Sequence, residues 1–163
     1  MITPFLNILF GSGISTLVGS IVGLLVSYNI ISKRARVRYQ PLFLFNDVMM
    51  LSIMTLVWYY VDNLYLAYLF FIIMSSVFLV YKLLVAVYSM DKRFRLLVLS
   101  LGADHSEYSR FILEKNLGRF FANILKFYVL CIISFLTSLT ICASDIGFFG
   151  LIVGLVFSLV QTD

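Results

Sequence analysis

Long apolar runs alternate with short polar segments along this chain. The runs cover residues 4–31, 42–61, 64–90 and 120–143, and a shorter one of fourteen residues covers 147–160. A helix needs about 20 apolar residues to span a bilayer, because a rise of ~1.5 Å per residue must cover a hydrocarbon core of ~30 Å. The pattern therefore predicts four transmembrane helices and a last apolar segment that is short for a full span.

The composition agrees with this pattern. The 163 residues are 62% apolar and 12% charged, and the mean hydropathy is +1.04. Soluble domains have about 45–50% apolar and about 25% charged residues, and a globule of this size cannot bury such an excess of apolar surface. We expect a single all-α integral membrane domain over residues 1–163, with four to five transmembrane helices embedded in a lipid bilayer.

The basic residues predict the orientation of the helices. Four positive charges lie between Lys33 and Arg38, and most of the remaining charge lies in the segment 91–119. Two spans separate these segments, so both lie on one side of the membrane, and an excess of Lys and Arg marks the cytoplasmic side. Asp62 and Asp145, at the opposite turns, are then expected outside.

The polar segment 91–119 is too long for a simple connection between two spans. Its pattern predicts a helix that stops at Gly102, followed by a second helix capped by Asp104 or Ser106 with Glu107 in its first turn. The expected apolar positions of the second helix are Tyr108, Phe111 and Ile112. A short helical element between two spans is suited to contact with a soluble partner.

This segment resembles the cytoplasmic coupling loop of ABC-importer permeases, in the subgroup for sulfonate, taurine, nitrate and thiamine precursors. Asp91 precedes the tetrad of residues 100–103 by the subgroup's nine-residue spacing. Further similar positions are Ser32-Lys33-Arg34, Gln40-Pro41-Leu42, Trp58, Gly147 to Leu151 and Thr162-Asp163. The chain departs from the family at Leu96-Leu97-Val98, which replaces Glu-Ala-Ala, and at Lys115-Asn116-Leu117, which replaces the Leu-Pro end. The family's first and last spans have no counterpart.

The resemblance implies a permease subunit that is not itself an enzyme. A separate ATPase subunit would dock on the coupling loop, through Ser100, Leu101, Gly102, Ala103, Tyr108 and Phe111. A second permease copy or a homologous chain would complete the pathway, and a solute-binding protein is a further expected partner. The expected location is the bacterial plasma (inner) membrane.

A second resemblance points to another class of membrane protein. Arg119, Asn123 and Tyr128 follow the spacing of the proton-path helix in subunit a of rotary ATP synthases, which would place the chain in an organellar inner membrane. The alternative interpretation is that Arg119 and Lys126 lie near the cytoplasmic end of their span and extend to the interface. A purely structural membrane subunit of a large complex is the third possibility.

The small residues and the two cysteines indicate helix packing rather than a chemical role. Rows at intervals of four residues allow close helix contact, and they contain Gly19, Gly23, Gly150 and Gly154. Cys131 and Cys142 are eleven residues apart in one apolar run, which predicts two unpaired packing residues on one face of a single helix.

Charged residues inside the apolar runs are few. Lys82 either extends to the cytoplasmic interface or lines a path for an anion, and Asp47 is expected to cap a helix or to pair on the same side. His105 has no second ligand at metal-binding spacing, so no metal site is predicted. We find no P-loop and no catalytic triad, and the dispersed net charge of +4 does not indicate nucleic-acid binding. No cofactor is expected.

Overall fold

The computed structural model describes residues 2–32, 46–88, 100, 102 and 104–160, and these residues form helices and the turns between them. The helices are α1 (Ile2–Ser32), α2 (Asp47–Tyr60), α3 (Leu64–Tyr88), α5 (His105–Lys115), α6 (Leu117–Ser138) and α7 (Ala143–Val160). No strand occurs among the residues named above. The predicted all-α class is confirmed.

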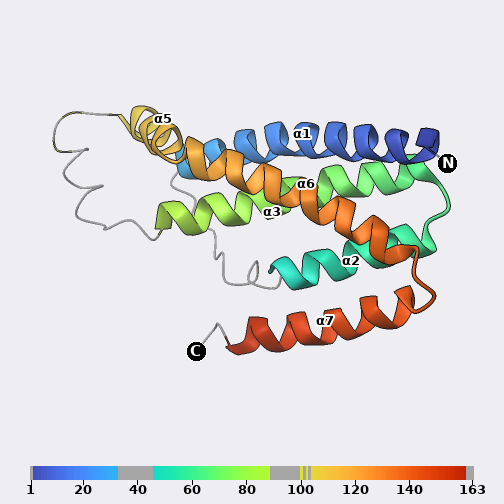
Figure 1. The fold of residues 1–163 in the computed structure, drawn as a ribbon. Helices are drawn as coiled ribbons and strands as arrows, with labels where there is room; N and C mark the ends of the chain where they lie inside the picture. Colours follow the sequence, from blue (N-terminus) through green and yellow to red (C-terminus); the bar gives the residue numbers. More distant parts are fainter. Residues whose placement is uncertain (1, 33–45, 89–99, 101, 103, 161–163) are drawn as a thin grey trace.

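Two helix pairs and one crossing helix make up the bundle (Figure 1). Helix α1 packs along α3, α2 packs along α7, and α6 contacts both pairs. The N-terminus, the α2–α3 turn and the α6–α7 turn lie at one end, which is the outer end in the predicted orientation. At the opposite end lie α5 and the start of α6, while α2 begins further into the bundle.

In the part of the chain that the structure describes, four helices are long and apolar enough to cross a membrane. These stretches are Phe5–Ser32, Leu64–Val87, Leu117–Ser138 and Ala143–Val160. The last was expected to be short, but α7 has 18 residues because Ser144 and Asp145 belong to its first turn, where an acidic side chain favours the helix dipole. The predicted second span is the short one, since α2 has only 14 residues. The part of that prediction before residue 46 lies outside the described residues.

Asparagines set the ends of several helices. At the predicted turn after α2, the side chain of Asn63 accepts a bond from Tyr65 N at 3.0 Å and its carbonyl accepts one from Ala67 N at 3.1 Å. Asn116 separates α5 from α6, and its side-chain amide donates to Ile112 O at 2.9 Å. Such local bonds satisfy backbone groups that a helix end leaves free.

The prediction for the two cysteines is correct in that both are free, and wrong in that it placed them on one helix. Cys131 is buried in α6, with its Sγ 3.8 Å from Met54 Sδ, but Cys142 is exposed in the turn before α7. The helix ends at Ser138, short of the predicted residue 143. Hydroxyl groups of residues 137, 138 and 140 bond backbone carbonyls there, and the chain turns away. The two thiols are free, as predicted, but they do not share a helix.

This difference between the thiols gives a test of the orientation. In intact cells, a membrane-impermeant maleimide is expected to label Cys142 from outside and to leave the buried Cys131 unlabelled. The Cys142→Ser variant should lose the label, whereas Cys131→Ser should keep it. If labelling of Cys142 requires permeabilised cells, the orientation predicted from the basic segments is reversed.

The glycine rows pack as predicted. A Cβ at Gly19 would lie 2.5 Å from Ile72 O of α3, and one at Gly23 would lie 3.0 Å from Ser76 O. On the other pair, a Cβ at Gly154 would lie 2.9 Å from Met49 Cβ of α2, and one at Gly150 would overlap the side chain of Ser52. These positions let both helix pairs approach more closely than larger residues would allow.

Candidate functional site

One charged cluster lies inside the bundle, at the junction of three helices. Asp47 is the first residue of α2, and its Oδ1 lies 3.3 Å from Lys82 Nζ of α3. Its Oδ2 accepts a hydrogen bond from Lys126 Nζ of α6. We call these three residues the Asp47 cluster. Its net charge is +1, because two ammonium groups share one carboxylate.

The residue before this cluster ties α2 to α7. Asn46 caps α2, because its Oδ1 accepts a bond from Met49 N at 2.9 Å. Its Nδ2 donates to Gly154 O of α7 at 2.8 Å. A single side chain therefore fixes both the start of α2 and its neighbour, and the carboxylate of Asp47 is held in place against α3 and α6.

The cluster lies well inside the helices that carry its lysines. Lys126 is nine residues after Leu117, the first residue of α6, which is roughly 14 Å of helix. Lys82 is six residues before Tyr88, the last residue of α3, which is roughly 9 Å. Because α2 begins only at Asp47, its start is set back from the α5 end of the bundle (Figure 1).

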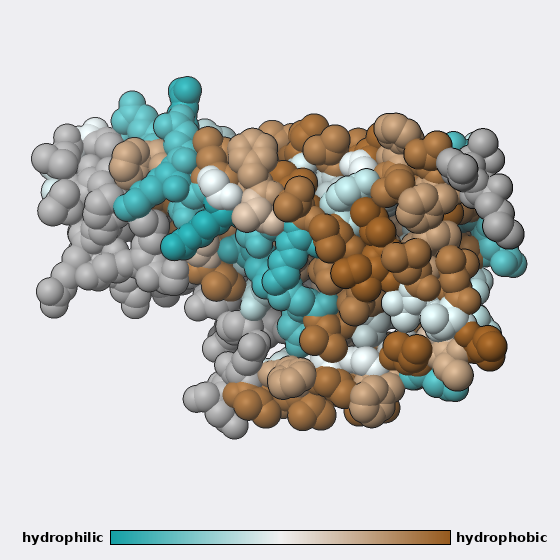
Figure 2. Space-filling model, viewed as in Figure 1, coloured by the Kyte–Doolittle hydropathy of each residue, from teal (hydrophilic) through white to brown (hydrophobic). Residues whose placement is uncertain are grey.

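Polar side chains on α6 lead towards the cluster. Arg119, Asn123 and Lys126 are spaced by four and three residues and therefore share one face of the helix. Figure 2 shows hydrophilic side chains at the α5 end of the molecule and again where α6 passes the start of α2, between hydrophobic surfaces. The polar face of α6 thus connects the α5 end of the bundle with the Asp47 cluster.

The cluster is partly open to its surroundings. The exposed side-chain fractions are 26% for Lys82, 36% for Asp47 and 47% for Lys126. Lys82 is the most enclosed, and its ammonium lies 5.2 Å from the ring centre of Phe78 and 5.7 Å from that of Tyr81. Aromatic faces attract a cation at these distances, which holds Lys82 towards Asp47. The pairing expected for Asp47 is confirmed.

The second candidate site is the element between α3 and α6 that contains α5. Gly102 has a φ of 88°, a left-handed conformation that favours glycine, so the predicted bend is present. Asp104 precedes α5 as its N-cap residue, and its backbone N donates to Glu107 Oε2 at 3.1 Å. Ser100 and Gly102 are exposed. Leu101, Ala103 and residues 91–99 lie outside the described residues.

The apolar face of α5 differs from the prediction. Tyr108, which was expected to contact a partner, is buried within the chain with 5% of its surface exposed. Ile112 and Leu113 are buried as well. Phe111 is 48% exposed. The buried face of α5 lies against α1 and α6, so the surface that can reach a partner is the opposite one, with Phe111. Tyr108 is therefore a packing residue and not a docking residue.

The residues of the alternative proton path are placed as follows. Arg119 is the third residue of α6 and is exposed, and Asn123 is partly exposed one turn further on. A guanidinium at the start of a span reaches the membrane interface, which agrees with the interpretation of Arg119 as an interfacial residue. Among the described residues, no group of three His, Cys, Asp or Glu side chains could hold a metal.

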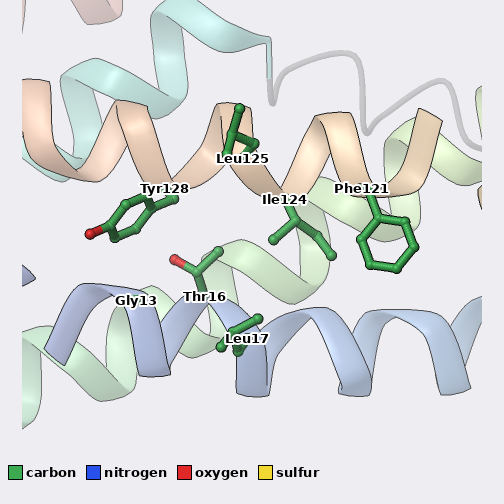
Figure 3. A pocket seen from close by; sticks show the side chains of 7 residues that line it. All are labelled: Gly13, Thr16, Leu17, Phe121, Ile124, Leu125 and Tyr128. Atoms are coloured by element: carbon green, nitrogen blue, oxygen red, sulfur yellow. The ribbon is translucent and has the colours of Figure 1, made fainter. Parts of the chain in front are cut away.

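An apolar groove lies between α1 and α6, with a volume of about 390 Å³. Figure 3 shows its walls, and the lining residues are Gly13, Thr16, Leu17, Phe121, Ile124, Leu125 and Tyr128. No charged side chain lines it. Its chemistry suits a hydrocarbon surface and offers little for recognition of a polar solute.

Comparison of the chain with protein-family models, curated proteins and solved structures finds no match. The function is therefore inferred from the chain's own residues. Two residues of the site, Asn46 and Lys126, were not predicted as site residues from the sequence. Asn46 precedes an acidic residue and an apolar run, which is a helix-start signal, and Lys126 continues the polar spacing of Arg119 and Asn123.

Proposed function

We propose that this chain is the membrane-spanning permease subunit of an ABC-type importer. The observation that carries the proposal is the cytoplasmic element between α3 and α6: an exposed bend at Gly102 followed by α5. Its partners would be a separate ATPase subunit, a second permease copy or homologous chain, and a solute-binding protein. The residues that would face the ATPase are Ser100, Gly102 and Phe111.

The packing of α5 supports a mechanical role for this element. Its buried residues contact α1 and α6, which belong to the transmembrane bundle. A force applied to the exposed face of α5 would therefore reach two spans directly. A partner can shift a conformational equilibrium only through contacts that differ between the two states, and a docked ATPase that closes on nucleotide would supply such contacts.

The arrangement of the bundle supports movement between two states. The α2–α7 pair meets the α3 and α6 side through the Asp47 cluster near the cytoplasmic end. Nearer the outer end, the ring of Trp58 of α2 lies 5.0 Å from that of Phe71 of α3 and 5.3 Å from that of Phe135 of α6, centre to centre. Contacts at the two ends can break in turn while the glycine-packed pairs move as units, which is the geometry that alternating access requires.

The bend at Gly102 provides the test of docking. A β-branched residue is strained at a φ of 88°, so Gly102→Val should change the direction of α5 and reduce co-purification of the P-loop ATPase at least several-fold. The matched control is Gly118→Val, because Gly118 lies in α6 and a Cβ there would also meet no atom within 4 Å. The measurement is the ATPase-to-permease ratio in gently solubilised native membranes, with membrane insertion checked for each variant.

Equal co-purification of the ATPase with both variants would contradict the docking role. Recovery of a ring of c-type subunits instead of a P-loop ATPase would replace the proposal with the rotary-synthase alternative. In that case, Arg119 is the next residue to substitute.

A further inference from the structure

We propose that Lys82 and Lys126 form a binding site for an oxyanion, in which the bound group competes with Asp47 for the two ammonium groups. The evidence for the oxyanion site is the geometry of the Asp47 cluster. A role of this site in solute uptake would rest in addition on the proposed permease function.

The charge of the cluster is the first argument. One carboxylate neutralises one lysine, and the second lysine leaves a charge of +1 in a mostly apolar bundle. Each ammonium has three N–H donors, and each lysine contacts a different oxygen of Asp47. Two further donors on each lysine are thus available to oxygen atoms of a ligand. A single structural ion pair would need only one of the two lysines.

Access is the second argument. Lys126 is 47% exposed and lies at the inner end of the polar face formed with Arg119 and Asn123. An anion arriving from the cytoplasmic end meets Arg119 first and the Asp47 cluster last. The opposite face of α6, along the α1 groove, is apolar, so the charged route runs along one side of the helix only.

The position of Asp47 is the third argument. Its carboxylate joins α2, and through Asn46 also α7, to lysines on α3 and α6. An oxyanion that takes over both lysines removes this ionic link between the α2–α7 pair and the helices that carry the lysines, while the packing of α2 on α6 remains. Binding would then favour the state in which the link is broken, since the ligand interacts more strongly with the lysines when Asp47 is withdrawn.

Inorganic phosphate is the probe for the test. The full chain is placed in nanodiscs of neutral lipid, and its unfolding temperature is measured with increasing phosphate against chloride at equal ionic strength. We expect a saturable rise with phosphate, because a ligand that binds only the folded state stabilises it. Lys126→Gln and Lys82→Gln should each weaken phosphate binding by about tenfold, as expected for loss of one charge-assisted contact.

Asp47→Asn is the decisive variant. It keeps the shape of the side chain and removes the competing charge, so phosphate should bind about tenfold more tightly than to the unaltered chain. Arg110→Gln is the matched control for loss of a positive charge, because Arg110 pairs with Glu114 on the exposed face of α5. It should leave phosphate binding unchanged.

The same protein in nanodiscs with anionic phospholipid identifies the source of the group. If a lipid headgroup is the ligand, stabilisation should appear without phosphate and be lost in Lys126→Gln. If a soluble anion is the ligand, stabilisation should require added phosphate in both lipids. The absence of any lysine-dependent effect in either lipid, or weaker binding by Asp47→Asn, would overturn the proposal. This experiment contains no ATPase, so its failure would not touch the docking test, and the reverse also holds.

Discussion

Asp47→Ala is expected to loosen the contact of α2 with α3 and α6 and to lower the unfolding free energy of the protein by about 1–2 kcal/mol. The substitution removes both carboxylate contacts and leaves Lys82 and Lys126 facing each other as like charges. A fully buried pair broken in this way costs about 3–5 kcal/mol, and partial exposure of all three side chains reduces that figure by screening. Denaturation of the purified protein in detergent micelles measures the effect.

Two comparisons make this expectation specific. Asp47→Asn should be less harmful than Asp47→Ala, because an amide oxygen can still accept a bond from one lysine. The double variant Asp47→Ala with Lys126→Met should recover part of the loss, since the repulsion is gone. A double variant no more stable than Asp47→Ala would show that the charges of the cluster do not act together.

Gly19→Ala is expected to separate α1 from α3, at a cost of about 1–3 kcal/mol. The added Cβ would lie 2.5 Å from Ile72 O and 2.7 Å from Ser75 Cβ. The first of these is a backbone atom, so relief requires a shift of one helix against the other. The higher helix propensity of alanine offsets only about 1 kcal/mol of this cost.

Gly13→Ala is the matched control in the same helix. Its Cβ would have Tyr128 Cε2 at 3.5 Å as the nearest neighbour, which is an ordinary contact. We expect it to be neutral or slightly stabilising in the same denaturation measurement. Equal stability of the two variants would show that the row containing Gly19 and Gly23 does not set the distance between α1 and α3.

Sequence reasoning predicted the spans better than their ends. Apolar runs identify what lies in lipid, and they gave four of the five bundle helices almost in full. They failed where polar residues belong to a helix, as at Ser144 and Asp145 in the first turn of α7. They failed again where hydroxyl groups ended α6 at Ser138 inside a run that remains apolar. A pattern of apolar and charged residues does not reveal such local hydrogen bonds.

The site was predicted only in its parts. Asp47 and Lys82 stood out as charges in apolar runs, and the bend at Gly102 followed from its helix-stop position. That Lys126 completes the cluster depends on how α6 crosses α2, which no local pattern contains. Tyr108 was assigned to the wrong face because its spacing with Ile112 defines a stripe and does not say what covers it.

The short α2 also has a consequence for the surrounding lipid. Its 14 residues span only about 21 Å, while the hydrocarbon core measures ~30 Å. Such hydrophobic mismatch is relieved by thinning the bilayer beside the short element, at a cost of fractions of a kcal/mol per Å. The headgroup region would then dip towards Asp47 on this side of the bundle. The protein would favour thin membranes, and membrane thickness itself would influence how readily the two lysines meet water.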